Sequence, residues 1–275
     1  MKQDLLNEKS NFSEISKSIC KIKKDKNNNA TGFFLRTKYN KNHIYFLVTA
    51  HHEIPYTLVE PGDSKIEIIT DFENIKQNIT LNKKERKILC FEKEDITAIE
   101  ILDTDIIRNK VKFLKYDKDC TENKRLSYLN IEMFIFHHPN GEKLQCNKGK
   151  IIEIGNPKIY EFSHNLYTQK GSSGSPILFY KKSHKRPYPK PRVIGVHTSC
   201  DSETKTNIGT FIYSLTDIIK EGKHNFEYTH KLRLFEHKEY AFPSGTQVYA
   251  KIIKVDENSC LKMEPGTKLI IGADI

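Results

Sequence analysis

The sequence predicts an all-β protein whose short strands form barrels or sandwiches. Runs rich in Ile, Val, Phe, Tyr and Thr recur along the 275 residues, and Gly, Pro, Asn and Asp interrupt them. No stretch has the period of a long amphipathic helix, and no internal repeat of roughly 20–50 residues is visible. About a dozen short strands with so few helices are typical of barrel and sandwich folds.

Strands are expected wherever β-branched and aromatic residues form a run between two turn signals. In chain order they are Glu14–Lys23, Gly32–Lys38, His43–Thr49, Lys65–Thr70, Ile79–Asn82, Ile96–Leu102, Ile131–His137, Gly149–Ile154, Ile159–Ser163, Ser175–Phe179, Val193–Thr198 and Thr210–Ser214. One helix is expected over Leu215–Glu221, and part of the first dozen residues is a second candidate.

A polar stretch over Tyr116–Lys124 separates two β-rich halves of the chain. We therefore expect an N-terminal segment over residues 1–14 and two domains over residues 15–116 and 117–221. Residues 222–275 are expected to form a C-terminal β-rich extension, and the sequence does not indicate its role.

The composition excludes several functional classes. The chain has 45 Lys and Arg against 35 Asp and Glu, a net charge of +10, and 37% hydrophobic residues, which is typical of a globular protein. The positive charges are scattered rather than gathered with aromatic residues on one stripe, so nucleic acid is not an expected partner. The densest basic run, Lys181–Arg192, is rich in proline and favours an exposed hairpin tip over an anion-docking site.

Several absences in the sequence predict the compartment. No apolar run approaches the roughly 18 residues of a membrane helix, so no membrane association is expected. The first ten residues lack the apolar core of a secretory signal, and the six cysteines form no C-x-x-C pair. We expect a cytoplasmic protein with reduced thiols, without a metal site and without a cofactor.

Four separated stretches carry the residues with catalytic chemistry. They are TAHH at residues 49–52, DITAIEI at 95–101, TQKGSSGSPI at 168–177 and VIGVHT at 193–198. In the third, two glycines bracket a serine, so the backbone can turn tightly and direct N–H groups at one point.

In this order, and over roughly Ile15 to Lys220, the motifs resemble those of the trypsin/chymotrypsin-like serine peptidases of the PA clan. The resemblance implies two six-stranded antiparallel β-barrels, the first with the catalytic His and Asp and the second with the Ser. A short helix would follow the second barrel. The implied activity is hydrolysis of peptide bonds through an acyl-enzyme, by an intracellular serine endopeptidase acting on proteins or peptides.

The resemblance also assigns roles to residues. Ser173 would be the nucleophile, His52 its base and Asp95 the partner of His52, and the N–H groups of Gly171 and Ser173 would form the oxyanion hole. His51 is the rival base, but the family's spacing selects His52. His137-His138, which precede a turn, are expected to have no catalytic role.

The sequence departs from the digestive members of the family. Ser172 stands where they carry the Asp that pairs with a newly cut N-terminus, so activity should not depend on N-terminal trimming. Glu53 stands where they carry a Cys. These departures resemble the intracellular, bacterial glutamyl-endopeptidase-like and viral branches.

The resemblance extends to the substrate pocket. Thr168 and His197 match the Thr and His with which those branches bind an acidic or amide P1 side chain, so P1 is expected to be Glu or Gln. The alternative is that both residues only satisfy hydrogen bonds of the pocket wall. Thr198 begins a strand segment that should pair its backbone with the substrate.

Other chemistries fit less well. The second residue after Ser173 is Ser175, so the G-x-S-x-G elbow of α/β-hydrolases is absent, and His52-Glu53 lacks the second His of a zincin helix. The main alternative is a catalytically silent module that keeps the protease fold to bind peptides or a regulatory partner. For the active enzyme, a regulatory protein is an expected partner besides the substrate.

Overall fold

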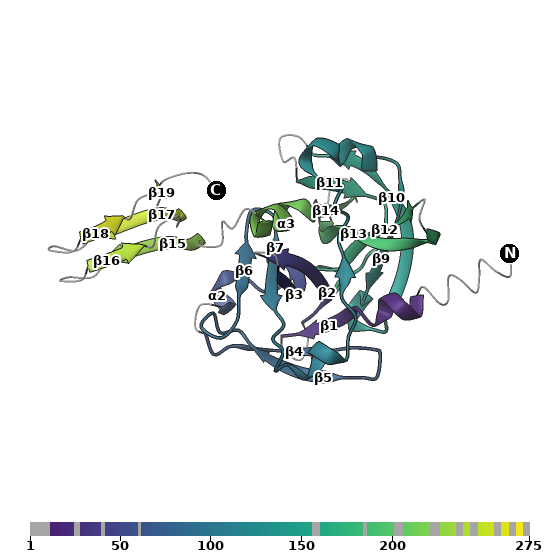
Figure 1. Cartoon of the computed structure of the whole chain (residues 1–275), viewed down its shortest axis with the longest axis horizontal. Coiled ribbons are helices and arrows are strands. Elements are labelled where there is room, and N and C mark those ends of the chain that lie inside the picture. Colours follow the sequence, from purple (N-terminus) through teal and green to yellow (C-terminus); the bar gives the residue numbers. More distant parts are fainter. Residues whose placement is uncertain are drawn as a thin grey trace. The chain divides into compact units, whose positions relative to one another are not determined.

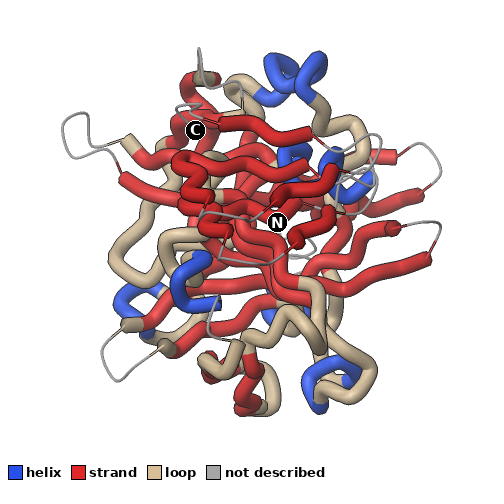
Figure 2. The backbone as a smooth tube through the Cα atoms, turned by 90° about the vertical axis from the view of Figure 1, so that its left-hand side faces the viewer, coloured by secondary structure: helices blue, strands red, loops and turns tan. Residues whose placement is uncertain are grey.

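The computed structural model consists mostly of strands, joined by loops and short helices (Figures 1 and 2). It describes residues 12–24, 28–39, 42–59, 62–155, 160–183, 186–200, 206–220, 226–234, 239–242, 247–255, 260–263 and 268–271. The chain divides into two units, Met1–Thr37 with Asn42–Leu215 and Lys38–Lys41 with Thr216–Ile275, and each is described by itself. None of the helices in these ranges is long and apolar enough to span a bilayer.

The first part of the larger unit is a curled sheet of eight strands. They are β1 (Ile19–Lys23), β2 (Asn29–Tyr39), β3 (Asn42–Ala50), β4 (Lys65–Ile69), β5 (Lys76–Thr80), β6 (Ile88–Phe91), β7 (Ile96–Glu100) and β8 (Leu114–Lys115). The pairing order is β5-β4-β1-β2-β3-β7-β6, and β8 pairs with β2. A short helix, α2 (Tyr56–Val59), lies between β3 and β4.

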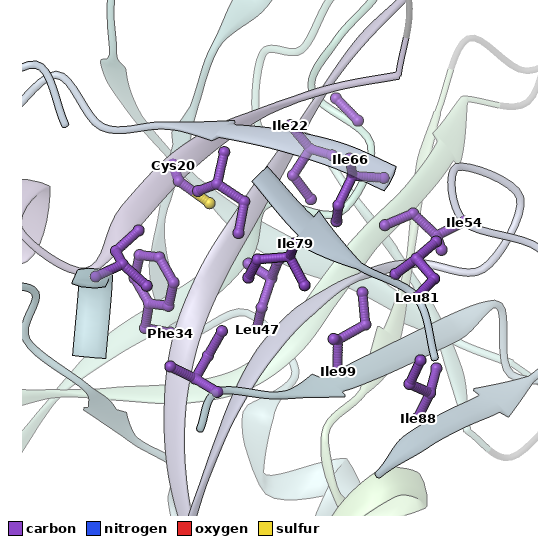
Figure 3. Packing of buried hydrophobic residues seen from close by; sticks show 14 of the residues in the cluster. Cys20, Ile22, Phe34, Leu47, Ile54, Ile66, Ile79, Leu81, Ile88 and Ile99 are labelled. Atoms are coloured by element: carbon purple, nitrogen blue, oxygen red, sulfur yellow. The ribbon is translucent and has the colours of Figure 1, made fainter. Parts of the chain in front are cut away.

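Apolar side chains on the inner face of this sheet form its core (Figure 3). Phe34 of β2, Leu47 of β3 and Ile99 of β7 are all fully buried. Gly32 gives them room, because a Cβ there would lie 2.7 Å from Ile22 and 2.8 Å from Leu47. This packing holds the ends of β3 and β7, where two of the motifs lie, in a fixed core.

The second part of the larger unit is a closed antiparallel barrel of six strands. They are β9 (Glu132–His137), β10 (Gln145–Ile154), β11 (Glu161–His164), β12 (Pro176–Ser183), β13 (Arg186–Cys200) and β14 (Asn207–Phe211). The order around the barrel is β10-β11-β14-β13-β12-β9. Helix α3 (Tyr213–Lys220) follows β14.

The predicted all-β fold with two barrels is confirmed. In the first barrel the pairing path runs from β5 to β6 and does not join those two edges, so the sheet is curled but open, whereas the second barrel is closed. Each of the twelve expected strands overlaps an observed strand, but the ranges expected over Ile79–Asn82 and Thr210–Ser214 share only two residues with β5 and with β14. The expected helix overlaps α3, and its last residue, Glu221, lies outside the described residues.

The strand predicted over Glu14–Lys23 is wrong in its first part. Residues 12–16 are helical, and β1 begins only at Ile19. Lys17 Nζ lies 3.2 Å from Glu14 Oε1, which is the contact that residues three apart make on a helix. Residues 1–11 of the predicted N-terminal segment lie outside the described part of the chain.

The smaller unit is β-rich, as the sequence predicts for the C-terminal extension. One sheet has the order β15 (Phe226–Leu234), β17 (Gln247–Val255) and β19 (Lys268–Ile271), and β16 (Glu239–Phe242) pairs with β18 (Cys260–Met263). All of these pairs are parallel. Successive strands alternate between the two sheets, because parallel neighbours need a crossover between them. The expected boundaries after residues 14, 116 and 221 stay a prediction.

Candidate active site

The pairing of β3 with β7 brings His52 and Asp95 together. Ala50, the last residue of β3, lies opposite Ile96, the first residue of β7. Because the strands are antiparallel, His51 and His52, which follow β3, lie beside Asp95, which precedes β7, at one edge of the sheet. The result is a hydrogen bond of 2.7 Å between Nδ1 of His52 and Oδ2 of Asp95.

The Asp95 carboxylate is held in place by further contacts. Its Oδ1 accepts a hydrogen bond of 2.8 Å from the backbone N–H of His52, and its carbonyl accepts one of 3.0 Å from the N–H of His51. The backbone of Asp95 has φ of 52°, a left-handed conformation that Asp tolerates better than most residues. A strained backbone held by three bonds fixes the carboxylate against the imidazole.

Glu53 occupies the other side of the His52 ring. Its Oε1 lies 3.3 Å from His52 Nε2, and its Oε2 lies 2.7 Å from Nζ of Lys24. The hydrogen bond to Asp95, followed by that to Glu53, raises the pKa of His52 to about 9. Burial alone would raise the pKa of Glu53, but the bonds from His52 and Lys24 outweigh burial and lower it. The sequence motifs draw attention to Glu53 for the cysteine it replaces and for the absent zincin motif, and they do not predict this contact.

Ser173 lies in a tight loop that packs against the end of β3. The flanking residues Gly171 and Gly174 have φ of 88° and 85°, which other residues rarely adopt. A Cβ on Gly174 would lie 2.1 Å from Thr49 Oγ1 and 2.9 Å from the N atom of Ala50. The nucleophile predicted from the sequence is therefore next to the strand end that His52 follows.

The hydroxyl of Ser173 donates to the carbonyl of Thr198 at 3.3 Å. The hydrogen bonds of the described residues join His52 to Asp95 and Glu53, and none joins His52 to Ser173. The structure thus brings His52 and Asp95 into contact and sets Ser173 beside their strand, with its hydroxyl turned to β13.

The loop leaves two backbone N–H groups unused. Asn140 N–H donates to the carbonyl of Lys170 at 2.5 Å, and Ser175 N–H donates to that of Ser172 at 3.1 Å. The Lys170 carbonyl belongs to the same peptide as the N–H of Gly171, and the Ser172 carbonyl to the same peptide as the N–H of Ser173. In a trans peptide the N–H points opposite to the C=O, so both N–H groups point away from these hydrogen-bond partners. Across the described ranges neither N–H has an acceptor. Two unpaired donors on neighbouring turns are what an oxyanion hole requires.

A buried polar network supports the same loop from beneath. Nδ1 of His137 lies 2.6 Å from Oγ of Ser172, and the N–H of Gln169 donates to that oxygen at 3.0 Å. Asn147 Nδ2 donates to His137 Nε2 at 2.8 Å, so the ring proton is on Nδ1 and is given to Ser172. Burial lowers the pKa of His137 to about 4, which keeps the ring neutral. The sequence assigned no catalysis to His137 and missed its supporting contact.

Of the two predicted pocket residues, His197 lies on β13 and Thr168 lies in the loop that follows β11. His197 on β13 is buried, and its Nδ1 lies 3.1 Å from the carbonyl of Ile208 and 3.2 Å from Nε2 of His164. A bond to a carbonyl requires the proton on Nδ1, so Nε2 of His197 carries a lone pair. Burial lowers the pKa of His197 to about 3, so the ring is neutral.

Thr168 is fixed in a similar way. Its hydroxyl donates to Asn207 Oδ1 at 2.5 Å. Asn207 Nδ2 donates to the carbonyl of Leu166 at 2.7 Å, and this bond sets which end of the amide faces Thr168. Because the Thr168 hydroxyl donates its proton to Asn207, it can present only lone pairs to a ligand. His164 and Asn207 are partners that the sequence did not reveal, because they come from β11 and β14.

Thr198 lies at the start of a free-standing strand edge. β12 pairs with β13 no further than Pro176 opposite Val196, while β14 continues along β13 to Cys200. Ser199 is exposed at this position. An extended peptide can add to such an edge.

Two further predictions concern His51, the rival base, and the absence of a metal site. His51 is buried, and its Nδ1 lies 3.0 Å from Oγ1 of Thr97, so it packs rather than faces the loop. No cluster of three or more His, Cys, Asp or Glu side chains suited to a metal ion occurs in the part of the chain that the structure describes.

No protein-family model matches the sequence, and no curated protein matches it. Among solved structures the chain is similar to Deg5, with 14% identity and a TM-score of 0.53 over 81% of this chain and 98% of Deg5. It is also similar to the serine endoprotease from Yersinia pestis, with 10% identity and a TM-score of 0.52 over 77% of this chain. The HtrA-type protease AlgW, solved with a tripeptide, gives 11% identity and a TM-score of 0.52 over 78% of this chain.

The chain has the trypsin-like serine protease fold. The alignments cover 64% of the Yersinia pestis chain and 64% of AlgW, so the chain spans less than two thirds of either. The resemblance drawn from the motifs is confirmed at the level of the fold. The finer resemblance to glutamyl endopeptidases and viral proteases stays a prediction.

Proposed function

We propose that this protein is a serine endopeptidase whose triad is Ser173, His52 and Asp95. The observation that carries the proposal is the Gly171–Gly174 loop: its two unpaired N–H groups lie beside the end of β3, and the His52–Asp95 pair lies at the same end. A nucleophile, a base with an orienting carboxylate, and an oxyanion hole are the parts that acyl transfer needs.

In the proposed reaction Ser173 turns its hydroxyl from Thr198 to the neutral Nε2 of His52. The oxygen attacks the scissile carbonyl carbon as its proton passes to Nε2, and the carbonyl electron pair becomes an oxyanion held by the two N–H groups. Collapse of the intermediate breaks the C–N bond, and the amine takes the proton from His52. Water then hydrolyses the acyl-enzyme by the same steps, and Asp95 stabilises the imidazolium throughout.

The pocket supports Gln over Glu as the P1 residue. The neutral ring of His197 and the hydroxyl of Thr168 both present lone pairs, because each has given its proton to Ile208 or Asn207. A carboxamide supplies N–H donors to these lone pairs, whereas a carboxylate meets them with lone pairs of its own. The substrate backbone would pair with the strand edge that starts at Thr198.

The substrates are proteins or peptides, and the proposed compartment is the cytoplasm. Cys20 is a buried thiol and Cys90 a half-buried one, which supports a reducing compartment. Ser172, bonded to His137, leaves no carboxylate at that position for a new N-terminal amine, so activity would need no N-terminal trimming.

A second candidate function rests on a specific observation. His52 Nε2 is bound by Glu53 and the Ser173 hydroxyl by Thr198, so base and nucleophile each have another partner. A catalytically silent module that binds peptides or a regulatory partner would keep these bonds. In an enzyme they break when substrate binds.

A fluorophosphonate probe distinguishes the two functions. The endopeptidase is expected to be labelled and its Ser173→Ala variant not, and absence of labelling in both favours the silent module. Internally quenched peptides with Gln, Glu, Leu or Arg at P1 then measure specificity. We expect the highest kcat/KM with Gln, loss of that preference in His197→Ala, and no change in Tyr167→Phe, because residue 167 is 57% exposed. Equal cleavage after Gln and Leu would overturn the pocket assignment.

A further inference from the structure

Thr31 reaches from the first barrel into the loop that carries Ser173. It lies on β2 and is fully buried. Its backbone N–H donates to the carbonyl of Ser173 at 3.0 Å, and its hydroxyl donates to the carbonyl of Gly171 at 2.8 Å. The same hydroxyl oxygen accepts a hydrogen bond of 2.9 Å from the N–H of His138.

These contacts set the direction of the peptides around Gly171. The Thr31 hydroxyl holds the Gly171 carbonyl, and Asn140 N–H holds the carbonyl of Lys170. His138, whose N–H donates to the same hydroxyl, lies only two residues before Asn140. The Thr31 hydroxyl oxygen therefore joins the segment that holds Asn140 to the loop that holds Gly171. The N–H of Gly171 points into the site only while the Lys170 carbonyl points out of it.

Thr31 is itself held from the side of β3. Thr49 Oγ1 donates to the carbonyl of Thr31 at 2.9 Å. Gly174 approaches the same two residues, because a Cβ there would lie 2.2 Å from the Thr31 carbonyl oxygen. The Gly171–Gly174 loop has no room to move toward β2 and β3. Its remaining conformational freedom is rotation of the peptides whose groups bind the Thr31 hydroxyl.

We propose that the Thr31 hydroxyl is a positioning group that keeps the oxyanion hole open. This inference rests on the proposed function, since it names a residue that prepares the hole for that reaction. Thr31 contacts neither the substrate nor the reacting atoms, and it acts through Gly171 and His138. Without the hydroxyl the Gly171 carbonyl and the His138 N–H lose their shared partner inside the protein. The loop then spends part of its time with the hole unformed.

The test compares variants with and without the hydroxyl. Thr31→Val and Thr31→Ala remove it and keep the backbone bond to Ser173, while Thr31→Ser restores it. Thr37→Val is the matched control, because Thr37 lies on the same strand, is 2% exposed, and has a hydroxyl without a partner among the described residues. Three measurements are made: kcat and KM on a peptide substrate, affinity for a peptide boronic acid, and amide hydrogen exchange over residues 169–175.

In the hydroxyl-lacking variants we expect kcat to fall about 10- to 100-fold, somewhat less than the loss of an oxyanion donor. KM should stay within about twofold, since the ground state makes little use of the hole. The boronic acid should bind more weakly by the same factor as kcat, and exchange of the loop amides should be faster. Thr31→Ser should recover all three values, and Thr37→Val should match the wild type.

Each contrary outcome has its own meaning. Wild-type kcat and exchange in Thr31→Val and Thr31→Ala would overturn the positioning role and leave the proposed function standing. If the wild type neither cleaves nor is labelled, the proposed function fails, and faster loop exchange in the two variants still decides the positioning role. If both variants unfold while Thr31→Ser folds, the hydroxyl holds the two barrels as a whole and the proposal is overturned.

Discussion

Oε1 of Glu53 lies 3.3 Å from Nε2 of His52, the ring nitrogen that receives the serine proton in the proposed reaction. Nδ1 of the same ring is bonded to Asp95, so two carboxylates share one imidazole. An imidazole that is hydrogen-bonded to two carboxylates is more stable in its protonated form, so the pKa of His52 is raised to about 9. A protonated His52 cannot act as a base, so Glu53 opposes the proposed reaction until its contact is broken.

The first prediction is that Glu53→Gln moves the pH dependence of kcat/KM. Activity requires neutral His52 and therefore rises with pH through the pKa of His52, near 9 in the wild type. A carboxamide removes one anionic partner, so the pKa of His52 falls and the rising limb moves to lower pH. Each pKa unit by which the pKa of His52 falls raises the neutral fraction of His52 at pH 7 about tenfold. The pH profile of kcat/KM from pH 5 to 10 measures the shift.

Glu85→Gln is the control for that profile. Glu85 is an exposed carboxylate in the first barrel, and its Oε1 accepts a hydrogen bond of 3.0 Å from Nδ2 of Asn82. Its removal should leave the rising limb in place. If Glu53→Gln and Glu85→Gln give the same profile as the wild type, the Glu53–His52 contact does not persist in solution.

The second prediction concerns the other carboxylate. Asp95→Asn should keep the bond from the His52 N–H but present an amide N–H to Nδ1, which forces the ring proton onto Nε2. His52 then has no lone pair toward Ser173, and kcat should fall about 10³- to 10⁴-fold. Steady-state kinetics measure this loss, and NMR of the ring nitrogens reports the tautomer. Asp103→Asn, at a side chain 94% exposed, should change neither, and a loss of less than tenfold in Asp95→Asn would speak against its role.

The sequence predicts the parts of this site that local patterns specify. Histidine after an apolar strand, aspartate before an alternating one and serine between glycines are local signals, and β3 and β7 lie within two residues of their expected ranges. Strand β6 was not expected because its four residues, ILCF, are too short to show alternation. The expected strand includes residues 14–16 of the helical segment 12–16, because Ile15 continues an apolar pattern into β1.

The contacts that tune the site could not be predicted in this way. Thr31 and Gly171 are 140 residues apart, and only the packing of two barrels joins them. The tautomer of His197 depends on a carbonyl from β14, and the proposed preference for Gln over Glu rests on that contact. Glu53 did leave a signal in the sequence, because an acidic residue directly after the proposed base is an unusual neighbour for an imidazole that has to be neutral to accept a proton.

The third prediction tests the network beneath the loop. Ser172→Ala removes the acceptor of both His137 Nδ1–H and the N–H of Gln169. Buried donors without partners cost roughly 1–3 kcal/mol, so the free energy of unfolding should fall by about that amount. Urea denaturation measures it. Ser127→Ala, at an exposed hydroxyl bonded to Lys124, is the control and should stay within about 0.5 kcal/mol of the wild type. Equal stability of the two variants would mean that the loop does not depend on this network.

The fourth prediction separates the close approach of the loop from the conformation of its backbone. Gly174 and Gly62 have similar φ, 85° and 76°, so alanine at either position carries the same conformational penalty of about 1–2 kcal/mol. Their surroundings differ: a Cβ at Gly174 would lie 2.1 Å from Thr49 Oγ1, whereas at Gly62 the nearest atom, on Asn82, is 4.0 Å away.

Gly62→Ala should therefore cost only the conformational penalty and leave probe labelling of Ser173 intact. Gly174→Ala should cost more than about 3 kcal/mol, because backbone atoms of the first barrel cannot move aside, and labelling should be lost. Thermal unfolding and fluorophosphonate labelling of the two variants measure the difference. The excess cost at Gly174 reports how tightly the serine loop is pressed against the strand end before His52, since the shared φ penalty cancels. If both variants are equally stable and equally labelled, the loop does not make that approach in solution, and Ser173 and His52 are not held together as the proposed reaction requires.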